Sequence, residues 1–547
     1  MDFVKERPLP VLVALGMLTH FIVFIRIKPV THAPPVALVL LTAPFVLFFA
    51  LCLSTNAKKL SSATTTTIWY TSFLAGVLLD MLAYRVFFHR LKHFPGPFLA
   101  RLTQWYHVWH VKDRIDNYKH LNKLHKQYGE FVRVGPNMLS VANPAIVNIA
   151  HGQTTKFTKS DWYEFGRPVT SLQQMTDHTL HDRRRRHGWD KAFTASALRS
   201  YDSRITNYTN KLIQQLRQRI GTSVNAQEWI GFFAFDVMGD LAFGRSFDAL
   251  ETGKSHWFID ALRDNGVPFG LFSTTMWLLE CFIRVPLPDS TNPMIQMVNF
   301  SNTLMDERKK SKPNEPDVVS HILDAGEFFS NPQEEEMLLT GDARLLVVAG
   351  SDTTAATLTH VLYHVARDPV IASKLRTELD EHDLHSDDGL SITSLAHLQY
   401  LNAVINETLR LHPPVPGGVY RKSPKGGVAI GDYFIPEGCV VLSPQYTIQR
   451  SPKAFAQPDE FIPERWTTRP ELILDKNAFF PFLLGRYGCI GKQLAYNEMR
   501  NVISRLVLEF DIAFAEGEDG TRLLEETQDH FTMGLAGLQL VFRERKT

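Results

Sequence analysis

This sequence contains few cysteines and has almost no net charge. Cysteine occurs four times in 547 residues, at Cys52, Cys281, Cys439 and Cys489, and no two of these form a CxxC pair. The sequence therefore predicts neither a disulfide framework nor a zinc site, and its main part is expected in a reducing compartment. The formal net charge is +1, so bulk charge gives no support for nucleic-acid binding or for an acidic partner.

Three long apolar runs occupy most of the first 90 residues. The first, 8–25, has no Asp, Glu, Lys or Arg and would measure about 27 Å as a helix, close to the thickness of a bilayer core. The second, 36–53, is interrupted by Pro44, and the third, 68–88, contains Asp80 and Arg85. Because no small-residue cleavage site follows the first run, an uncleaved anchor is favoured over a signal peptide.

We therefore predict a membrane anchor over 1–90 with three transmembrane helices, while one or two spans remain open. Basic residues gather after the third run, and the positive-inside rule then places the following domain in the cytosol. The stretch HFPGPFLARL at 93–102 stops a helix through its prolines and glycine. A globular domain is expected over 91–547. It would consist of amphipathic helices with short strand-like pieces, so the fold class is mainly α with minor β.

Cys489 stands in an unusual setting, FLLGRYGCIG at 482–491. Gly488 and Gly491 remove side chains on both sides of the sulfur, which suggests that a bulky group approaches the backbone there. A long helical pattern begins directly afterwards, so Cys489 is expected at a helix N-terminus, where N–H groups and the dipole favour a thiolate. Core filling is the commonest use of such a cysteine. The flanking glycines instead point to a metal ligand.

A second signal lies in LLVVAGSDTTAATLTHVLYHVARDP at 345–369, within one expected helix from about 333 to 367. Gly350 costs on the order of 1 kcal/mol there relative to alanine. The polar residues Asp352 and Thr353 follow it in an apolar stripe. Either could be the N-cap of a fresh helix. Alternatively, the helix is locally widened and presents an acid and a hydroxyl to a pocket, where they relay protons.

Three charged stretches complete the pattern. In NETLRLHPPVP at 406–416, Glu407 and Arg410 share one helix face and can pair, and Arg465 in FIPERW could join them. The stretch LHDRRRRHGWDKAF at 180–193 has four consecutive arginines. Such a run is usually a solvated face, but here it could meet the carboxylates of a cofactor or a protein partner.

Together these stretches resemble the cytochrome P450 family, the haem-thiolate monooxygenases, over about residues 93–547. Phe482, Gly485, Cys489 and Gly491 match the haem loop of that family, and AGSDTT matches the oxygen-activating part of its central helix. Its structural Glu–x–x–Arg and Pro–Glu–Arg elements are matched by Glu407, Arg410 and Arg465. The stretches FPGPFLARLTQ and FDVMGDLAFGRSF are similar to microsomal-type, especially fungal, members.

The resemblance implies a cytochrome P450 fold, haem b as the cofactor and Cys489 as the axial ligand of its iron. Phe482 would shield the sulfur, and Gly485 and Gly491 would let the backbone lie against the macrocycle. On the opposite side, Ala349 and Gly350 would leave room for dioxygen, while Asp352 and Thr353 would deliver protons. The residues Glu407, Arg410 and Arg465 would hold the fold.

One position departs from the family pattern. Members often have arginine two positions before the cysteine, paired with a haem propionate, but this chain has Tyr487 there. Tyrosine can donate one hydrogen bond and brings no charge. By position, the other propionate contacts are Arg421, His181 and Arg185.

The resemblance also implies a function: insertion of one oxygen atom from O2 into an apolar, membrane-partitioning small molecule, in secondary metabolite biosynthesis. Electrons would come from NADPH through a separate NADPH–cytochrome P450 reductase. The pocket is expected around 160–180, 240–285, 415–419 and 530–538. Two alternatives stay open, a haem-thiolate isomerase or dehydratase and a non-catalytic membrane haem-binding protein. The expected location is multi-pass in the lipid of the endoplasmic reticulum, with the catalytic domain in the cytosol.

Overall fold

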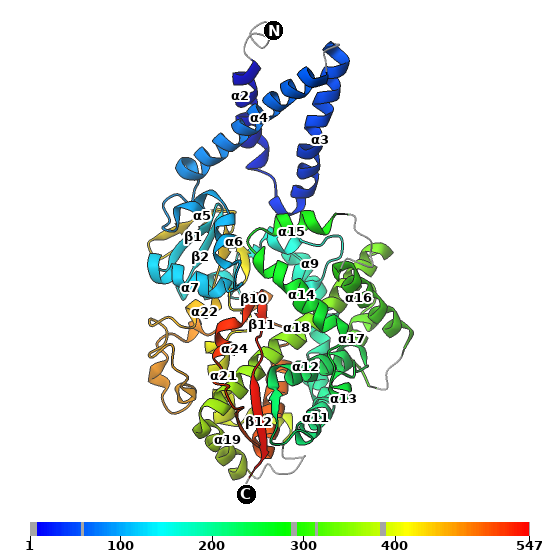
Figure 1. The fold of residues 1–547 in the computed structure, drawn as a ribbon. Helices are drawn as coiled ribbons and strands as arrows, with labels where there is room; N and C mark the ends of the chain where they lie inside the picture. Colours follow the sequence, from blue (N-terminus) through cyan, green and yellow to red (C-terminus); the bar gives the residue numbers. More distant parts are fainter. Residues whose placement is uncertain (1–7, 56–58, 286–292, 312–314, 383–389, 546–547) are drawn as a thin grey trace.

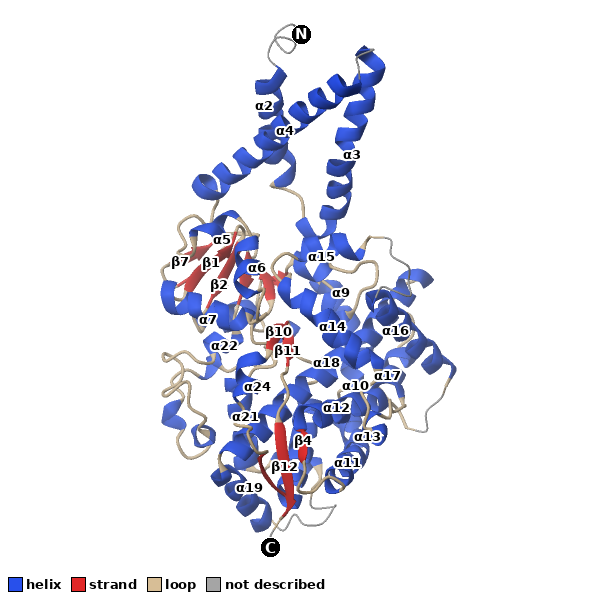
Figure 2. Cartoon of the chain, in the orientation of Figure 1, coloured by secondary structure: helices blue, strands red, loops and turns tan. Residues whose placement is uncertain are grey.

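The computed structural model describes residues 8–55, 59–285, 293–311, 315–382 and 390–545. A helix-rich body contains small sheets, and a group of apolar helices projects from one end of it (Figures 1 and 2). The expectation of a mainly α fold with minor β is confirmed.

The projecting group consists of α2 (Pro8–Thr19), continued by the π turn η1 (His20–Phe24), α3 (Pro29–Thr55) and α4 (Lys59–Ala83), continued by η2 (Tyr84–Phe88). The segments Pro29–Leu53 and Lys59–Phe88 are long and apolar enough to cross a membrane, and Pro8–Phe24 is a shorter apolar helix. The second and third runs are thus longer as helices than the expected 36–53 and 68–88. Pro44 does not break α3, which continues through it.

Helices α2 and α4 pack closely because each has a glycine at the crossing. A Cβ atom on Gly16 would lie 2.1 Å from the Phe73 carbonyl oxygen, and one on Gly76 would lie 2.0 Å from that of Val13. One turn further along, His20 Nδ1 lies 2.6 Å from Asp80 Oδ2. Asp80, which weakens the third apolar run, therefore has a partner inside the helix pair.

The body contains one mixed sheet in the order β1-β2-β8-β5-β3, in which β2 and β8 are parallel and the other pairs antiparallel. A second sheet has the order β4-β12-β9, and two hairpins are β6–β7 and β10–β11. The strand bounds are β1 Phe131–Gly135, β2 Met138–Val141, β3 Thr158–Lys159, β4 Ser223–Asn225, β5 Tyr420–Lys422, β6 Val428–Ile430, β7 Tyr433–Ile435, β8 Val440–Leu442, β9 Phe510–Phe514, β10 Gln528–His530, β11 Thr532–Gly534 and β12 Gln539–Glu544.

Helix α18 (Pro332–Arg367) crosses the middle of the body, and most of its second half is buried (Figure 1). It is helical throughout, as predicted, and neither Asp352 nor Thr353 starts a new helix. It packs against α12 (Ala226–Phe243), α16 (Pro293–Lys310), α21 (Gln399–Leu411) and α23 (Lys492–Glu509). The remaining longer helices are α7 Asn117–Tyr128, α11 Ala195–Arg217, α14 Trp257–Leu271, α15 Met276–Ile283 and α19 Pro369–Glu381. Shorter helices are α5 Phe98–Leu102, α6 Trp105–Val111, α8 Ala145–His151, α9 His178–Arg184, α10 Asp190–Ala192, α13 Ala249–Thr252, α17 Val318–Asp324, α20 Ile392–Ala396, α22 Gln445–Ile448 and α24 Thr521–Glu526.

Candidate active site

Cys489 lies in a tight loop that leads directly into α23. The 3₁₀ turn η10 (Gly485–Tyr487) precedes it, and the Cys489 N–H donates to the Phe482 carbonyl at 2.8 Å. Cys489 is exposed, whereas Tyr487 and Leu494 on either side of it along the chain are buried. Its sulfur is therefore not covered by other side chains and is available as a ligand.

Burial raises the pKa of the Cys489 thiol, and this is the largest effect on it. The backbone N–H groups of Gly491 and Lys492 and the guanidinium of Arg185 oppose the rise. The helix start thus stabilises the thiolate, as expected, but does not outweigh desolvation by itself. A bound metal cation would complete the deprotonation.

The two glycines of the haem-loop pattern have different surroundings. Gly485 has φ +60°, and a Cβ there would lie 2.6 Å from the Gly152 carbonyl oxygen, so this glycine lets the loop pack on the end of α8. A Cβ on Gly491 would lie 3.9 Å from both Cys489 Sγ and the Phe193 ring, which is ordinary contact distance. Gly491 is therefore the glycine that leaves space beside the sulfur.

One face of α18 is open in the middle of the body. Leu345, Val348, Ala349 and Asp352 follow the spacing of a single helix face; Ala349 is exposed and the other three are partly exposed. Gly350 does not contribute to this opening, because a Cβ there would lie 2.4 Å from the Met238 sulfur of α12. The expected space for dioxygen at Gly350 is thus filled by Met238, and the small side chain on the open face is that of Ala349.

Asp352 and Thr353 both stand at this opening. Burial raises the pKa of Asp352 to about 7, so the carboxyl group is partly protonated near neutral pH. The Thr353 hydroxyl donates to the Ala349 carbonyl at 2.9 Å, a bond within the helix that needs no widened turn. The pair can hold and transfer protons next to the open face.

The expected propionate contacts gather around Tyr487. His181 lies edge-on to the Tyr487 ring at 4.9 Å between centroids, and Arg421 Cζ lies 4.9 Å from the same ring centroid. Arg421 Nε and Tyr487 Oη are buried without a hydrogen-bond partner among the described residues. Burial, with the help of nearby cations, lowers the pKa of His181 to about 2. Polar atoms without partners and an excess of positive charge at one place fit an anionic group.

Arg185 makes different contacts. Its Nη1 donates to the carbonyls of Arg486 and Gly488 at 3.1 and 3.0 Å, and its Nε donates to Asp190 at 2.9 Å. It therefore holds the cysteine loop in place. In the same run, Arg184 is fully buried and paired with Asp342 at 2.9 Å, whereas Arg183 and Arg186 are exposed.

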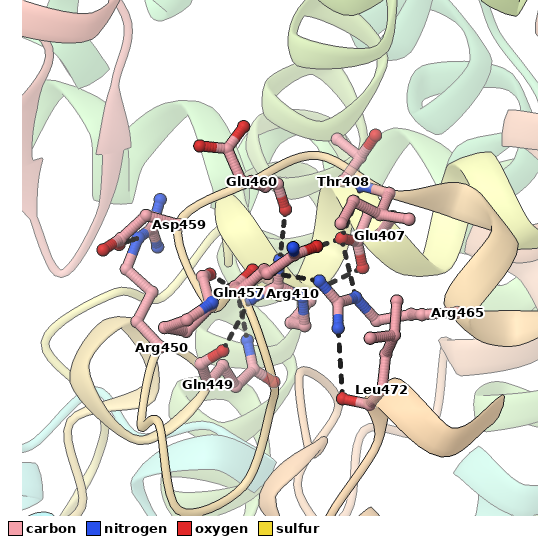
Figure 3. A network of polar contacts seen from close by, with 12 residues as sticks. Glu407, Thr408, Arg410, Gln449, Arg450, Gln457, Asp459, Glu460, Arg465 and Leu472 are labelled. Carbon is pink, nitrogen blue, oxygen red and sulfur yellow. Dashed lines mark hydrogen bonds and ion pairs between the residues drawn. The ribbon is translucent and has the colours of Figure 1, made fainter. Parts of the chain in front are cut away.

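Glu407 is the centre of a buried network (Figure 3). Its carboxylate accepts from Arg410 at 2.8 and 2.9 Å, from Arg465 at 3.0 Å and from the Trp466 indole at 2.9 Å. The two guanidinium groups also donate to backbone carbonyls of the segment before the cysteine loop, which are those of Gln449, Ala456, Gln457, Pro458, Glu460 and Leu472. The three side chains thus hold a meandering segment that has little secondary structure of its own.

The four segments expected to line the pocket come together. Trp162 stacks on Tyr420 at 4.7 Å and on Phe531 at 5.1 Å, and contacts Phe269 edge-on at 5.4 Å. Beside this cluster is a cavity of about 20 Å³ lined in part by Ser273, Gly417 and Asp529. The lining of this cavity is mixed: the rings of Tyr420 and Phe531 lie beside polar groups that include Asn117, Thr274 and Asp529.

Two buried ionisable side chains were not predicted from the sequence. Lys159, on β3, is buried beside Arg421, and Glu498, on α23, is buried with Oε2 unpartnered among the described residues. Burial raises the pKa of Glu498 to about 8, opposed by the nearby Thr354 hydroxyl. A polar residue inside an apolar helix stripe was the available signal for Glu498. Lys159 had none.

These observations fit an iron porphyrin with two carboxylates. A thiol at a helix start supplies an axial ligand, the open face of α18 presents the small side chain of Ala349, and the buried cations Lys159 and Arg421 form no ion pair with a carboxylate of the described residues. The fold and the site thus define a haem-thiolate protein.

Comparisons with known proteins agree. The family model described as Cytochrome P450 matches residues 95–542. Cytochrome P450 monooxygenase notG' of Aspergillus versicolor is 42% identical over 87% of each chain, and cytochrome P450 monooxygenase FCK2 of Fusarium pseudograminearum is 36% identical over 97% of each. The tryprostatin B 6-hydroxylase of Aspergillus fumigatus is 37% identical over 87% of this chain and 84% of its own. The crystal structure of the cytochrome P450DA heme domain, at 18% identity, has the same fold, with a TM-score of 0.67 over 83% of this chain and 97% of its own.

The chain belongs to the cytochrome P450 family. It is a monooxygenase whose cofactor is haem held by a cysteine thiolate, as predicted.

Proposed function

We propose that this protein hydroxylates an apolar small molecule in fungal secondary metabolite biosynthesis. The balanced reaction converts R–H, O2, NADPH and a proton to R–OH, water and NADP⁺. The observation that carries the proposal is the acid–alcohol pair Asp352 and Thr353 at the open face of α18. The name of the tryprostatin B 6-hydroxylase, at 37% identity, supports hydroxylation as the reaction class.

Cys489 is the proposed axial ligand, and haem, when bound to it, supplies the activation of dioxygen. Phe482 and Gly491 shape the space beside the sulfur, while Arg185 fixes the loop through two of its carbonyls. Arg421, His181 and Tyr487 would hold the propionates. Asp352 holds a proton near neutral pH and passes it on with Thr353, and Ala349 contributes the smallest side chain of the open face.

Electrons come from NADPH through a separate NADPH–cytochrome P450 reductase in the same membrane. Arg183 and Arg186 lie exposed on the segment whose Arg185 holds the cysteine loop, and they suit a docking face for an acidic partner. The anchor spans 1–90 as several membrane helices in the endoplasmic reticulum, with residues 91–547 in the cytosol. The apolar helices α3 and α4 support this arrangement.

The test measures which co-substrates the protein needs to form product. Purified holoprotein is combined with the reductase in lipid vesicles and given a panel of apolar metabolites that includes tryprostatin B. The proposal predicts a product that carries one atom from ¹⁸O2 and forms only with NADPH, O2 and the reductase. Product formation from a peroxide without NADPH would instead indicate an isomerase or dehydratase, and haem binding without any turnover a carrier.

A further inference from the structure

Lys159 occupies a position that is unfavourable for a lysine in the protein alone. It lies on β3, directly opposite Arg421 of the antiparallel strand β5. Both side chains are buried, with relative exposures of 6% and 1%. Like charges directly opposite each other on paired strands destabilise a sheet, and a buried charge without a counterion is strongly unfavourable.

The two cations converge on Tyr487. Lys159 Nζ lies 5.1 Å from the Tyr487 ring centroid and Arg421 Cζ lies 4.9 Å from it. Lys159 Nζ donates to the carbonyls of Leu172 and Gln173 at 3.1 and 2.6 Å. An ammonium group has three donors, so one N–H remains for a further acceptor.

Within the described residues, carboxylates do not balance this charge. Burial, together with Arg421 and Arg185, lowers the pKa of Lys159 well below its usual range, and the carboxylate that opposes this is that of Asp182. Asp182 is itself partly exposed and engaged by Arg486 at 3.1 Å. A nearby anion would restore the ordinary charge of Lys159 and also give Arg421 Nε a partner.

We propose that Lys159 is a haem-propionate ligand which, together with Arg421, supplies the positive charge that other family members obtain from an arginine at the position of Tyr487. Tyr487 then packs its ring against both cations, and its hydroxyl, which has no partner among the described residues, would be available to the same carboxylate. In this chain the positive charge near the propionate would thus come from strands β3 and β5 of the sheet, whereas in other members it comes from the cysteine loop. The competing role is purely structural, in which Lys159 braces the loop at Leu172 and Gln173.

The experiment measures how fast holoprotein loses haem to excess apomyoglobin, a readout independent of catalysis. Charge-assisted hydrogen bonds contribute about 1.5–3 kcal/mol, so Lys159→Met should release haem about 10- to 150-fold faster than the parent. Lys156→Met, an exposed lysine on the same segment, is the matched control and should change the rate by less than about twofold. The decisive variant is Lys159→Met combined with Tyr487→Arg, which returns the charge to the cysteine loop and should restore slow release.

Two results would overturn the proposal. One is a Lys159→Met protein that keeps haem as the parent does. The other is fast release that Tyr487→Arg does not slow. An arginine on the cysteine loop cannot replace the hydrogen bonds of Lys159 to Leu172 and Gln173, so this result would indicate the structural role. If Lys159→Met alone does not accumulate as holoprotein, the double variant decides: its accumulation with full haem supports the proposal, and its failure contradicts it.

Discussion

Asp352 has the property that a proton donor needs near neutral pH. Burial raises its pKa to about 7, far above the usual value of a carboxyl group, so its protonated fraction falls as pH rises through that value. Product formation in the parent should therefore decline above about pH 7. The residue also stands on the one face of α18 that opens into the body.

Asp352→Asn should retain haem but lower kcat by about 100-fold, within the range of general acid catalysis, and abolish the decline near pH 7. The measurement is kcat between about pH 6 and 8.5 with the reductase in excess. Glu334→Gln, an exposed acid on the same helix, is the control and should behave as the parent. A parental pH profile in Asp352→Asn would rule out the role.

Thr353→Ala should keep haem and consume NADPH at a near-parental rate but divert more of the electrons to hydrogen peroxide. The reason is that its hydroxyl is held at the open face by the Ala349 carbonyl and is placed to guide protons. The ratio of product to NADPH consumed checks this. Thr357→Ala removes an equivalent bond to the Thr353 carbonyl at 3.0 Å and should leave the ratio unchanged. Equal ratios in all three proteins would count against Thr353.

At the scale of elements, the Glu407 network holds the segment that leads to the cysteine loop. Glu407→Gln removes the charge between two fully buried guanidinium groups, so it should cost about 3–5 kcal/mol and greatly reduce haem-loaded protein. Glu464→Gln, which disrupts a partly exposed pair with Lys374, should cost less than about 1 kcal/mol. Haem content and thermal unfolding distinguish the two. Similar stability in both variants would show that the network does not hold the fold.

The pair of apolar helices α2 and α4 offers a second test at this scale. His20→Leu or Asp80→Leu alone leaves the other polar side chain unpaired between α2 and α4, and should lower the amount of full-length protein in membranes. The double substitution to leucine removes both groups and should restore that amount. Quantitative blotting of membrane fractions measures it. A double variant that accumulates less than either single variant would show that α2 and α4 do not pair through these residues.

Across the whole molecule, local motifs predicted the elements that carry the candidate site. The cysteine loop, helix α18 and the Glu407 pairing each depend on residues close in sequence or on one helix, and the structure shows these elements where they were expected. Long-range packing was not predictable. Gly350 packs on Met238 of another helix, Arg184 pairs with Asp342, and Lys159 faces Arg421 across strands that are distant in sequence. A single sequence contains no signal for such contacts, because they arise from tertiary packing.

The proposed chemistry depends on Cys489 binding the haem iron as a thiolate. The most direct measurement is the absorption spectrum of the reduced protein with carbon monoxide, compared between the parent and Cys489→Ser. We predict the long-wavelength band of a thiolate-ligated carbon monoxide complex in the parent and its loss in the variant. The same band in both proteins would contradict the account.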